Sequence, residues 1–444
     1  MADFFKTIFG AMAGPLFFFV GLYIIYKTFS VMGVQFAPVI SIILALTPIL
    51  LPVALFYITY DEWIKYVRLK FVINNGRSTL RIHLPQEVLK SPEAMESVMS
   101  QIHAGNYPDN LMESYLSGKH ALPFSFELAS IGGEVRFYIN VPTVKIKNAV
   151  EAQLYAQYPG IEVVEEQLDY TDEIVWDPEK YEMIVFHMGK KEDEVLPIKT
   201  YIDYGLDKMP KEEEKFEPMA PMIELLGKAK PHDRIWVQFL AIPHVKKDLK
   251  SGYRYSSGTW EAKAVDKVNE IMQRNKKVAF DQDEGERQVM LTAGEKDKIA
   301  AIERNVGKYA YEVGIRWIYL AEKGKFDGQM IGPLIRTFSQ YDILNRNGVG
   351  VRWRSDFDYK FISDFTGSRL RRWRKEEVKE YKLREYTTRD KKKFVDKMKV
   401  MSVEELATMF HIPGRAVVTP TMPRIVSTRK EAPSNLPTGI MTDI

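Results

Sequence analysis

Two long apolar runs open the chain, at residues 7–26 and 34–60. Lys27 is the only charged residue in these runs and their connector. A helix rises about 1.5 Å per residue, so about 20 residues cross a hydrocarbon core of roughly 30 Å, and both runs are long enough. Prolines do not argue against a span in lipid, where a neighbouring helix satisfies the freed carbonyl groups. The pattern predicts a transmembrane helical hairpin over residues 1–64.

Two other interpretations of an apolar amino-terminus compete with this one. A secretory signal peptide has a shorter apolar core and a small-residue cleavage site, and no second, longer apolar run follows it. A buried core hairpin would carry more charge, because about a quarter of the residues in soluble domains are charged. We therefore expect insertion into a membrane.

Basic residues set the expected orientation. They follow the second run closely, as Lys65, Arg68, Lys70, Arg77 and Arg81. The positive-inside rule then places both termini and the main body in the cytoplasm. We expect a protein of the cytoplasmic (inner) membrane, with the lipid bilayer as its first partner.

From residue 65 the pattern changes to alternating strands and amphipathic helices. The expected elements are a strand at 79–85, a helix at 91–105, a hairpin of two strands at 123–142, a helix at 143–160 and a strand at 161–170. Gly132 and Gly133 supply the hairpin turn. The order strand, helix, strand, strand, helix, strand is the ferredoxin-like pattern. We expect an α+β fold whose first ferredoxin-like module covers residues 65–170.

A weaker version of this pattern recurs over residues 171–345, where we expect a second, more irregular α+β module. Apolar alternation predicts strong strands around Val237 and Ile315. A long helix is expected around 260–273, and the polar stretch 276–289 has the composition of a loop. The long helix and the loop interrupt the second module.

The rest of the chain divides into two segments. Residues 346–400 mix aromatic and basic side chains and are expected to be a helical region. The segment 401–444 begins with a short helix, for which Ser402 and Glu405 form a capping box. Beyond that helix, many Pro, Thr and Ser residues indicate an extended tail.

Composition excludes several kinds of chemistry. The 444 residues contain no cysteine, which rules out disulfides, thiolate metal sites, cysteine-held iron clusters and cysteine nucleophiles. A net charge of +3 implies no nucleic-acid partner by itself. No G-x-x-x-x-G-K-[ST], G-x-S-x-G or H-E-x-x-H motif occurs, and the seven histidines lack ligand spacing. We expect no catalytic, cofactor or metal site, and His187 on an alternating strand is expected to be structural.

The most basic cluster in the chain consists of Arg369, Arg371, Arg372, Arg374 and Lys375. Three interpretations of it stay open. With Trp353 and Trp373, it has the composition of a surface that grips phosphates and stacks on single-stranded DNA. A basic surface tethered at a membrane is also attracted to anionic lipid. Alternatively the helix is solvated or faces a partner protein, and its charges pair with nearby carboxylates, which are Glu376, Glu377, Glu380 and Glu385.

Several segments together resemble the membrane-anchored amino-terminal part of bacterial type IV secretion and conjugative-transfer ATPases. They are FSFELASIGGEVRFYINVP, VEAQLYAQYPGIEV, EPMAPMIELLGKAKPHDRIWVQFL, YEVGIRWIYLAEKGKF, and MSVEELATMFHIPG with TPTMPRIVSTRKEAPSNLP. In that family the tail leads into a motor domain with Walker motifs, which pumps DNA or drives assembly. The resemblance ends at Ile444, where the motor would begin, so it carries over no catalytic residue. It implies a separately encoded motor or a truncated chain.

The resemblance also implies a role for the tail. The expected junction with a motor consists of Glu404, Leu406, Phe410, Pro413 and Leu436. We expect a non-enzymatic, membrane-anchored scaffold that forms a homo-oligomer and positions a separate ATPase. The alternative is a membrane-tethered protein that binds DNA or anionic lipid through the cluster from Arg369 to Lys375. An enzyme of unrecognised type is a third hypothesis, which nucleotide turnover by the chain alone would favour.

Overall fold

The computed structural model describes most of the chain after the first apolar run. The described residues are 23, 27, 37–85, 90–103, 108–142, 144–208, 216–245, 259–272, 291–356, 367–386, 398–414 and 423–425. They form two compact units, Met1–Val67 and Arg68–Ile444. The first expected span, 7–26, lies almost entirely outside the described residues.

The second apolar run forms part of α2, a helix of 39 residues from Ala37 to Asn75. Pro48 and Pro52 lie inside this helix. The stretch Leu44–Asn75 is long and apolar enough to cross a membrane, as judged by length and composition, and its most apolar part buries no residue within the protein. The boundary between the two units falls inside α2. The predicted helical state of the second run is therefore confirmed.

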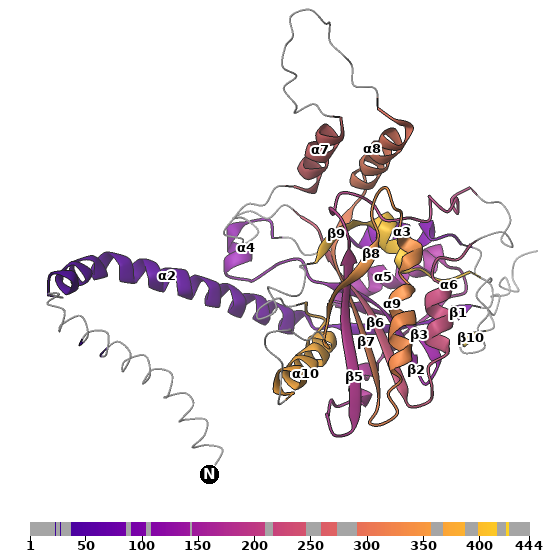
Figure 1. Ribbon diagram of the computed structural model, residues 1–444, viewed down its shortest axis with the longest axis horizontal. Helices are drawn as coiled ribbons and strands as arrows, with labels where there is room; N and C mark the ends of the chain where they lie inside the picture. Colours follow the sequence, from indigo (N-terminus) through magenta and orange to yellow (C-terminus); the bar gives the residue numbers. More distant parts are fainter. Residues whose placement is uncertain are drawn as a thin grey trace, which may run out of the picture. The chain divides into compact units, whose positions relative to one another are not determined.

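A ten-stranded sheet forms the second unit (Figure 1). Its strands are β1 (Ser78–Pro85), β2 (Phe124–Ile131), β3 (Glu134–Val141), β4 (Glu162–Glu166), β5 (Tyr181–Lys190), β6 (Asp233–Pro243), β7 (Ala310–Glu322), β8 (Val349–Arg354), β9 (Lys399–Ser402) and β10 (Arg424–Ile425). The pairing order is β10-β1-β3-β2-β6-β7-β5-β8, with β4 also on β1 and β9 also on β7. All pairs are antiparallel except β1 with β10.

Helices connect and cover the strands. In the second unit they are α3 (Glu93–Ile102), α4 (Leu111–Tyr115), α5 (Val144–Gln157), α6 (Ala220–Gly227), α7 (Trp260–Ile271), α8 (Ala293–Val306), α9 (Ile331–Arg336), α10 (Ser368–Leu383) and α11 (Val403–Met409). The expected α+β fold class is confirmed. The helix expected around 260–273 is α7, and Ser402 and Glu405 form the predicted capping box at α11.

The first half of the sheet has the order β4-β1-β3-β2. β2 and β3 form the predicted hairpin, in which Ile131 lies opposite Glu134. Both turn glycines have positive φ, 60° at Gly132 and 93° at Gly133. A Cβ atom on Gly133 would lie 2.8 Å from the carbonyl oxygen of Ala229, so this position requires glycine for its backbone conformation and for space.

The second half repeats the connectivity with larger insertions. β5 leads through α6 to β6, the pair α7 and α8 leads on to β7, and α9 leads to β8. The pairing order of this half is β6-β7-β5-β8. β2 pairs with β6 from Phe124–Ala241 to Ile131–Arg234, so the two halves share one continuous sheet.

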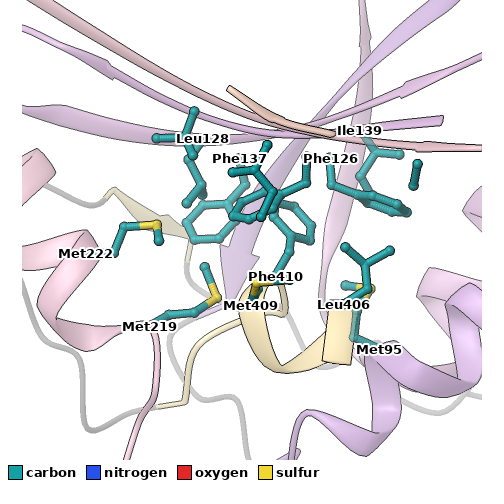
Figure 2. Close-up of a cluster of buried hydrophobic side chains, with 14 of the residues drawn as sticks. Met95, Phe126, Leu128, Phe137, Ile139, Met219, Met222, Leu406, Met409 and Phe410 are labelled. Atoms are coloured by element: carbon teal, nitrogen blue, oxygen red, sulfur yellow. The ribbon is translucent and has the colours of Figure 1, made fainter. Parts of the chain in front are cut away.

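Side chains alternate between two apolar layers, as the twofold period of a strand requires. In β7, Ile315, Trp317 and Tyr319 belong to a large core with α3, α5, α6, α9 and α11. Ile318 and Leu320 belong to a second core on the opposite face, beneath α10. α11 contributes Leu406 and Met409 to the large core, and the ring of the following residue, Phe410, lies 5.3 Å from that of Phe126, between centroids (Figure 2).

Candidate functional site

Helix α10 carries the predicted basic cluster. Its inner face is Trp373, Glu377, Val378 and Tyr381, all buried. Arg371, Arg372 and Lys375 are exposed, whereas Arg369 and Arg374 are half-buried. The guanidinium of Arg369 lies 5.6 Å from the centre of the Trp373 ring. Burial lowers the pKa of Arg374. Three of the five basic residues therefore present their charge to solvent.

The glutamates of α10 do not all pair along the helix surface, and in this respect the prediction is wrong for Glu377. Glu376 does pair with Arg372, at 3.8 Å. Glu377 points inward, and its Oε2 lies 3.3 Å from Arg316 Nη1 and 2.9 Å from His187 Nε2. Glu380 also lies near Arg316, at 3.7 Å. The reason is that Arg316 is fully buried on a central strand, and a buried guanidinium requires counter-charges.

His187 is structural, as predicted. It is buried on β5, and its two ring nitrogens contact Glu377 at 2.9 Å and the hydroxyl of Tyr386 at 2.7 Å. Trp353 and Trp373, which the sequence offered as stacking partners for bases, pack against each other at 5.8 Å between ring centroids. Both indoles are buried, so they belong to the core beneath α10.

A second buried ion cluster lies at the end of α10. Arg384 donates from Nε and Nη2 to the two carboxylate oxygens of Glu127, each at 3.0 Å. Its Nη2 also lies 2.6 Å from Asp169 Oδ2. Tyr170 and Gln238 donate further hydrogen bonds to Glu127, at 2.9 Å and 3.1 Å. The cluster therefore joins α10 to β2, β6 and the loop after β4.

Arg384 itself has a left-handed backbone, with φ of 52°. This conformation costs a residue other than glycine about 1–2 kcal/mol. Burial alone would raise the pKa of Asp169, but Arg384 and hydrogen bonds from Thr171 and Thr79 hold it below its ordinary value. The ion pairs thus stabilise both the ionised carboxylate and the strained residue that ends the helix.

Four of the five residues of the predicted junction with a motor are described, and Leu406 and Phe410 belong to the large core. The side chains of Glu404, Leu406 and Phe410 are buried, and so is Pro413. Leu436 lies outside the described residues. The role of these five residues in contacting a motor stays a prediction. In the described structure the first four stabilise the body of the protein.

Ion pairs fix α11 in that core. Glu404 contacts Arg304 at 3.1 Å and Lys308 at 2.9 Å. Glu405 lies 2.8 Å from Lys190, and both side chains are fully buried. These pairs connect the carboxy-terminal helix to β5, α8 and the segment that leads into β7.

In these clusters, buried carboxylates and cationic side chains neutralise each other's charge. Each described carboxylate above has a cationic partner within 4 Å. Within the described parts of the chain, no group of three His, Asp or Glu side chains is placed to hold a metal ion. Sequence reasoning missed the partners Glu127, Arg316 and Lys190. The sequence feature that indicates such a buried ion pair is a single charged residue inside an otherwise apolar strand, as in FSFELASI and IRWIYL.

These observations define the class of protein: an α+β body built on one mixed sheet, together with a long apolar amino-terminal helix. A family model described as a domain of unknown function (DUF8128) matches residues 69–424, and the chain belongs to this family. No curated protein and no solved structure matches the chain.

Proposed function

We propose that the chain is a non-enzymatic, membrane-anchored scaffold of a type IV secretion or conjugation-like machine, which positions a separate ATPase at the cytoplasmic face. The observation that carries the membrane anchor is α2, in which the segment Leu44–Asn75 is long and apolar enough to cross a bilayer and exposes its most apolar part. In water that exposure would be unfavourable, and lipid removes the cost. The run 7–26 supplies the other span of the hairpin.

The architecture of the body supports a scaffold role. We propose that each half of the sheet is a ferredoxin-like module. The support is the order β4-β1-β3-β2 in the first half and the corresponding order β8-β5-β7-β6 in the second. Ferredoxin-like modules use the connectivity strand, helix, strand, strand, helix, strand. The pair α7 and α8 then stands in place of the tight turn between the paired central strands β6 and β7 of the second module.

The scaffold proposal is tested by purification of the full chain from bacterial membranes in mild detergent. We expect an oligomer that carries an ATPase with Walker motifs, and no ATP hydrolysis by the chain alone. A membrane protein of similar size with the same tag is the control for adventitious capture. Any of three results would contradict the proposal: a chain that purifies as a lone monomer, a chain that stays in solution without detergent, or a chain that hydrolyses ATP without a partner.

The second candidate function is the binding of an anionic partner, DNA or lipid, through α10. The specific observation is that Arg371, Arg372 and Lys375 are exposed on α10, whereas Glu377 and Glu380 of the same helix lie beside the buried Arg316. An exposed cationic helix face is attracted to phosphates of either source.

Charge reversal tests this candidate. In neutral-lipid nanodiscs, R371E, R372E and K375E together should weaken binding of single-stranded DNA steeply and flatten its salt dependence. In anionic nanodiscs the same change should accelerate amide exchange in α10. Reversal of the exposed Lys208, Lys228 and Lys296 is the matched control. Unchanged behaviour in both arms would dismiss the candidate.

A further inference from the structure

Helix α4 has the inverse of the usual amphipathic pattern. Its buried residue is Ser114, which is 2% exposed. The large apolar side chains of the same segment face solvent: Leu111 is 48% exposed, Met112 is 66% exposed and Leu116 is 58% exposed. A soluble surface helix turns such side chains toward the core. Clustered exposure of this kind marks an interaction surface.

Polar contacts hold α4 in this orientation. The side chain of Asn110 caps the helix and accepts from the Glu113 amide at 2.9 Å. Glu113 accepts from the amide of Asp109 at 3.0 Å and from Lys119 at 2.9 Å. The apolar side chains are therefore presented by a helix whose start and end are both fixed.

The segment after α4 packs against the last turns of α2, within the same compact unit. The rings of His120 and Phe71 lie 5.6 Å apart, between centroids. Arg77 donates to the carbonyl oxygen of Pro123 at 2.8 Å. Residues Arg68–Asn75 belong to this unit and also to α2, in which they follow the apolar run that ends at Tyr60. The exposed apolar surface of α4 thus lies on a segment attached to the end of the candidate span.

The end of α2 has the composition of a membrane interface. Leu69 is 56% exposed and Ile73 is 68% exposed. The basic residues Arg68 and Lys70 flank Leu69 in the sequence. Apolar side chains next to basic ones are typical of elements that lie at the boundary between headgroups and acyl chains. The basic residues complement anionic headgroups.

We propose that α4 is an interfacial membrane-docking element: Leu111, Met112 and Leu116 insert at the bilayer surface beside the point where α2 enters the body. This inference rests on the proposed membrane anchor and adds to it a second contact with lipid. The bilayer is the occupant that the attachment of this segment to the end of α2, the helix that carries the candidate span, supports. One contact of this kind would restrict rotation of the body about a single helix.

The absence of cysteine makes a direct test possible, because a single introduced cysteine is the only labelling site. The full chain is reconstituted in vesicles of neutral and anionic phospholipid that contain spin-labelled lipid. M112C carries an environment-sensitive fluorophore. L50C on α2 reports anchoring, and K296C on α8 reports an exposed site away from α4. We expect the label at 112 to be quenched by shallow spin labels at least twofold more than the label at 296.

Further variants separate lipid contact from general hydrophobicity. In the M112C protein, L111S with L116S should reduce lipid quenching by half or more. L168S with V175S removes apolar side chains elsewhere that are even more exposed, and it should leave lipid quenching unchanged. All four positions are exposed, so the fold is retained.

Each outcome decides the proposal. A label at 112 that iodide in the buffer quenches as strongly as the label at 296 overturns it. A label shielded from both iodide and lipid also overturns it, in favour of a protein partner or a second copy of the chain. If the label at residue 50 is itself not quenched by lipid, the membrane anchor fails, and that result is distinguishable from failure of α4 alone.

Discussion

Arg384 illustrates how a single residue is fixed by contacts that are distant in sequence. Its left-handed backbone is a conformation in which glycine is favoured at the end of a helix. Its side chain, however, reaches Glu127 and Asp169 in the interior. Glycine at this position would relieve the backbone and leave two carboxylates without their main counter-charge. The ion pairs explain why arginine ends α10.

Removal of the Arg384 guanidinium should be strongly destabilising. We expect R384M to lower the free energy of unfolding by about 3–5 kcal/mol, because it leaves buried charges uncompensated. Adding E127Q should restore part of that loss, since one of the two carboxylates left without Arg384 is then neutral. R372M, an exposed change on the same helix, should have an effect within about 0.5 kcal/mol. Urea unfolding of the full chain in detergent measures the stability of the three variants. Equal losses for R384M and R372M would show that Arg384 does not neutralise buried carboxylates.

His120 gives the protein a dependence on pH. Burial lowers the pKa of His120 to about 4, and nearby Arg68 adds to the effect. An unfolded chain binds this proton near pH 6.5, so stability is full above about pH 6.5 and falls as the pH decreases toward about 4. The loss should reach up to about 3 kcal/mol. H120F keeps an aromatic ring beside Phe71. It should reduce the slope of the free energy of unfolding against pH by up to about 1.4 kcal/mol per pH unit, as measured by urea unfolding between pH 4 and pH 7. If the unsubstituted chain and H120F show the same pH dependence, the buried His120 is not its source.

At the scale of the element, α8 and α11 begin with the same capping box in different surroundings. Thr292 and Glu295 cap α8 at an exposed end. Ser402 and Glu405 cap α11 inside the large core, where Glu405 also pairs with Lys190. The local hydrogen bonds are alike, so any difference in the contributions of the two caps arises from burial and from the additional contacts of Glu405.

Substitution of the two caps should therefore have unequal effects. We expect S402A to cost about 2 kcal/mol, the upper end of the range for caps, because it leaves a buried amide without its acceptor. T292A should cost about 0.5–1 kcal/mol, because water replaces the hydroxyl. Thermal unfolding in detergent compares the two variants. A larger effect of T292A would mean that α11 is not part of the folded core.

At the scale of the whole molecule, the seam between β2 and β6 joins the two halves. Phe126 lies on that seam opposite Phe239, and its ring packs on Phe410 of the carboxy-terminal segment. Residues from the beginning, middle and end of the second unit therefore meet in one core. Such a core favours cooperative unfolding of both halves.

Hydrogen exchange tests this cooperativity. F126A should lower the free energy of unfolding by about 3–5 kcal/mol through loss of buried volume. We expect amide protection to decrease equally in β3 of the first half and β7 of the second, because the halves open together. T292A serves as a control that should leave both strands protected. Retained protection in β7 with loss in β3 would show that the halves are independent.

Much of the secondary structure followed from the sequence because its signals are local. The hairpin turn at Gly132 and Gly133, the helix at 260–273 and the capping box at Ser402 depend on residues a few positions apart. The apolar run in α2 likewise needs only composition and length. The ferredoxin-like modules, the membrane hairpin and the junction with a motor stay predictions.

The sequence by itself determined the α+β class, the apolar helix and the absence of thiol chemistry, because composition and period are properties of short stretches. Only the tertiary structure decided which charges are buried together, that Glu377 turns toward Arg316, and that α11 is a core helix. It also decided that Leu111, Met112 and Leu116 face outward. The physical reason is that burial and ion pairing depend on contacts between residues far apart in the chain, which no local pattern encodes.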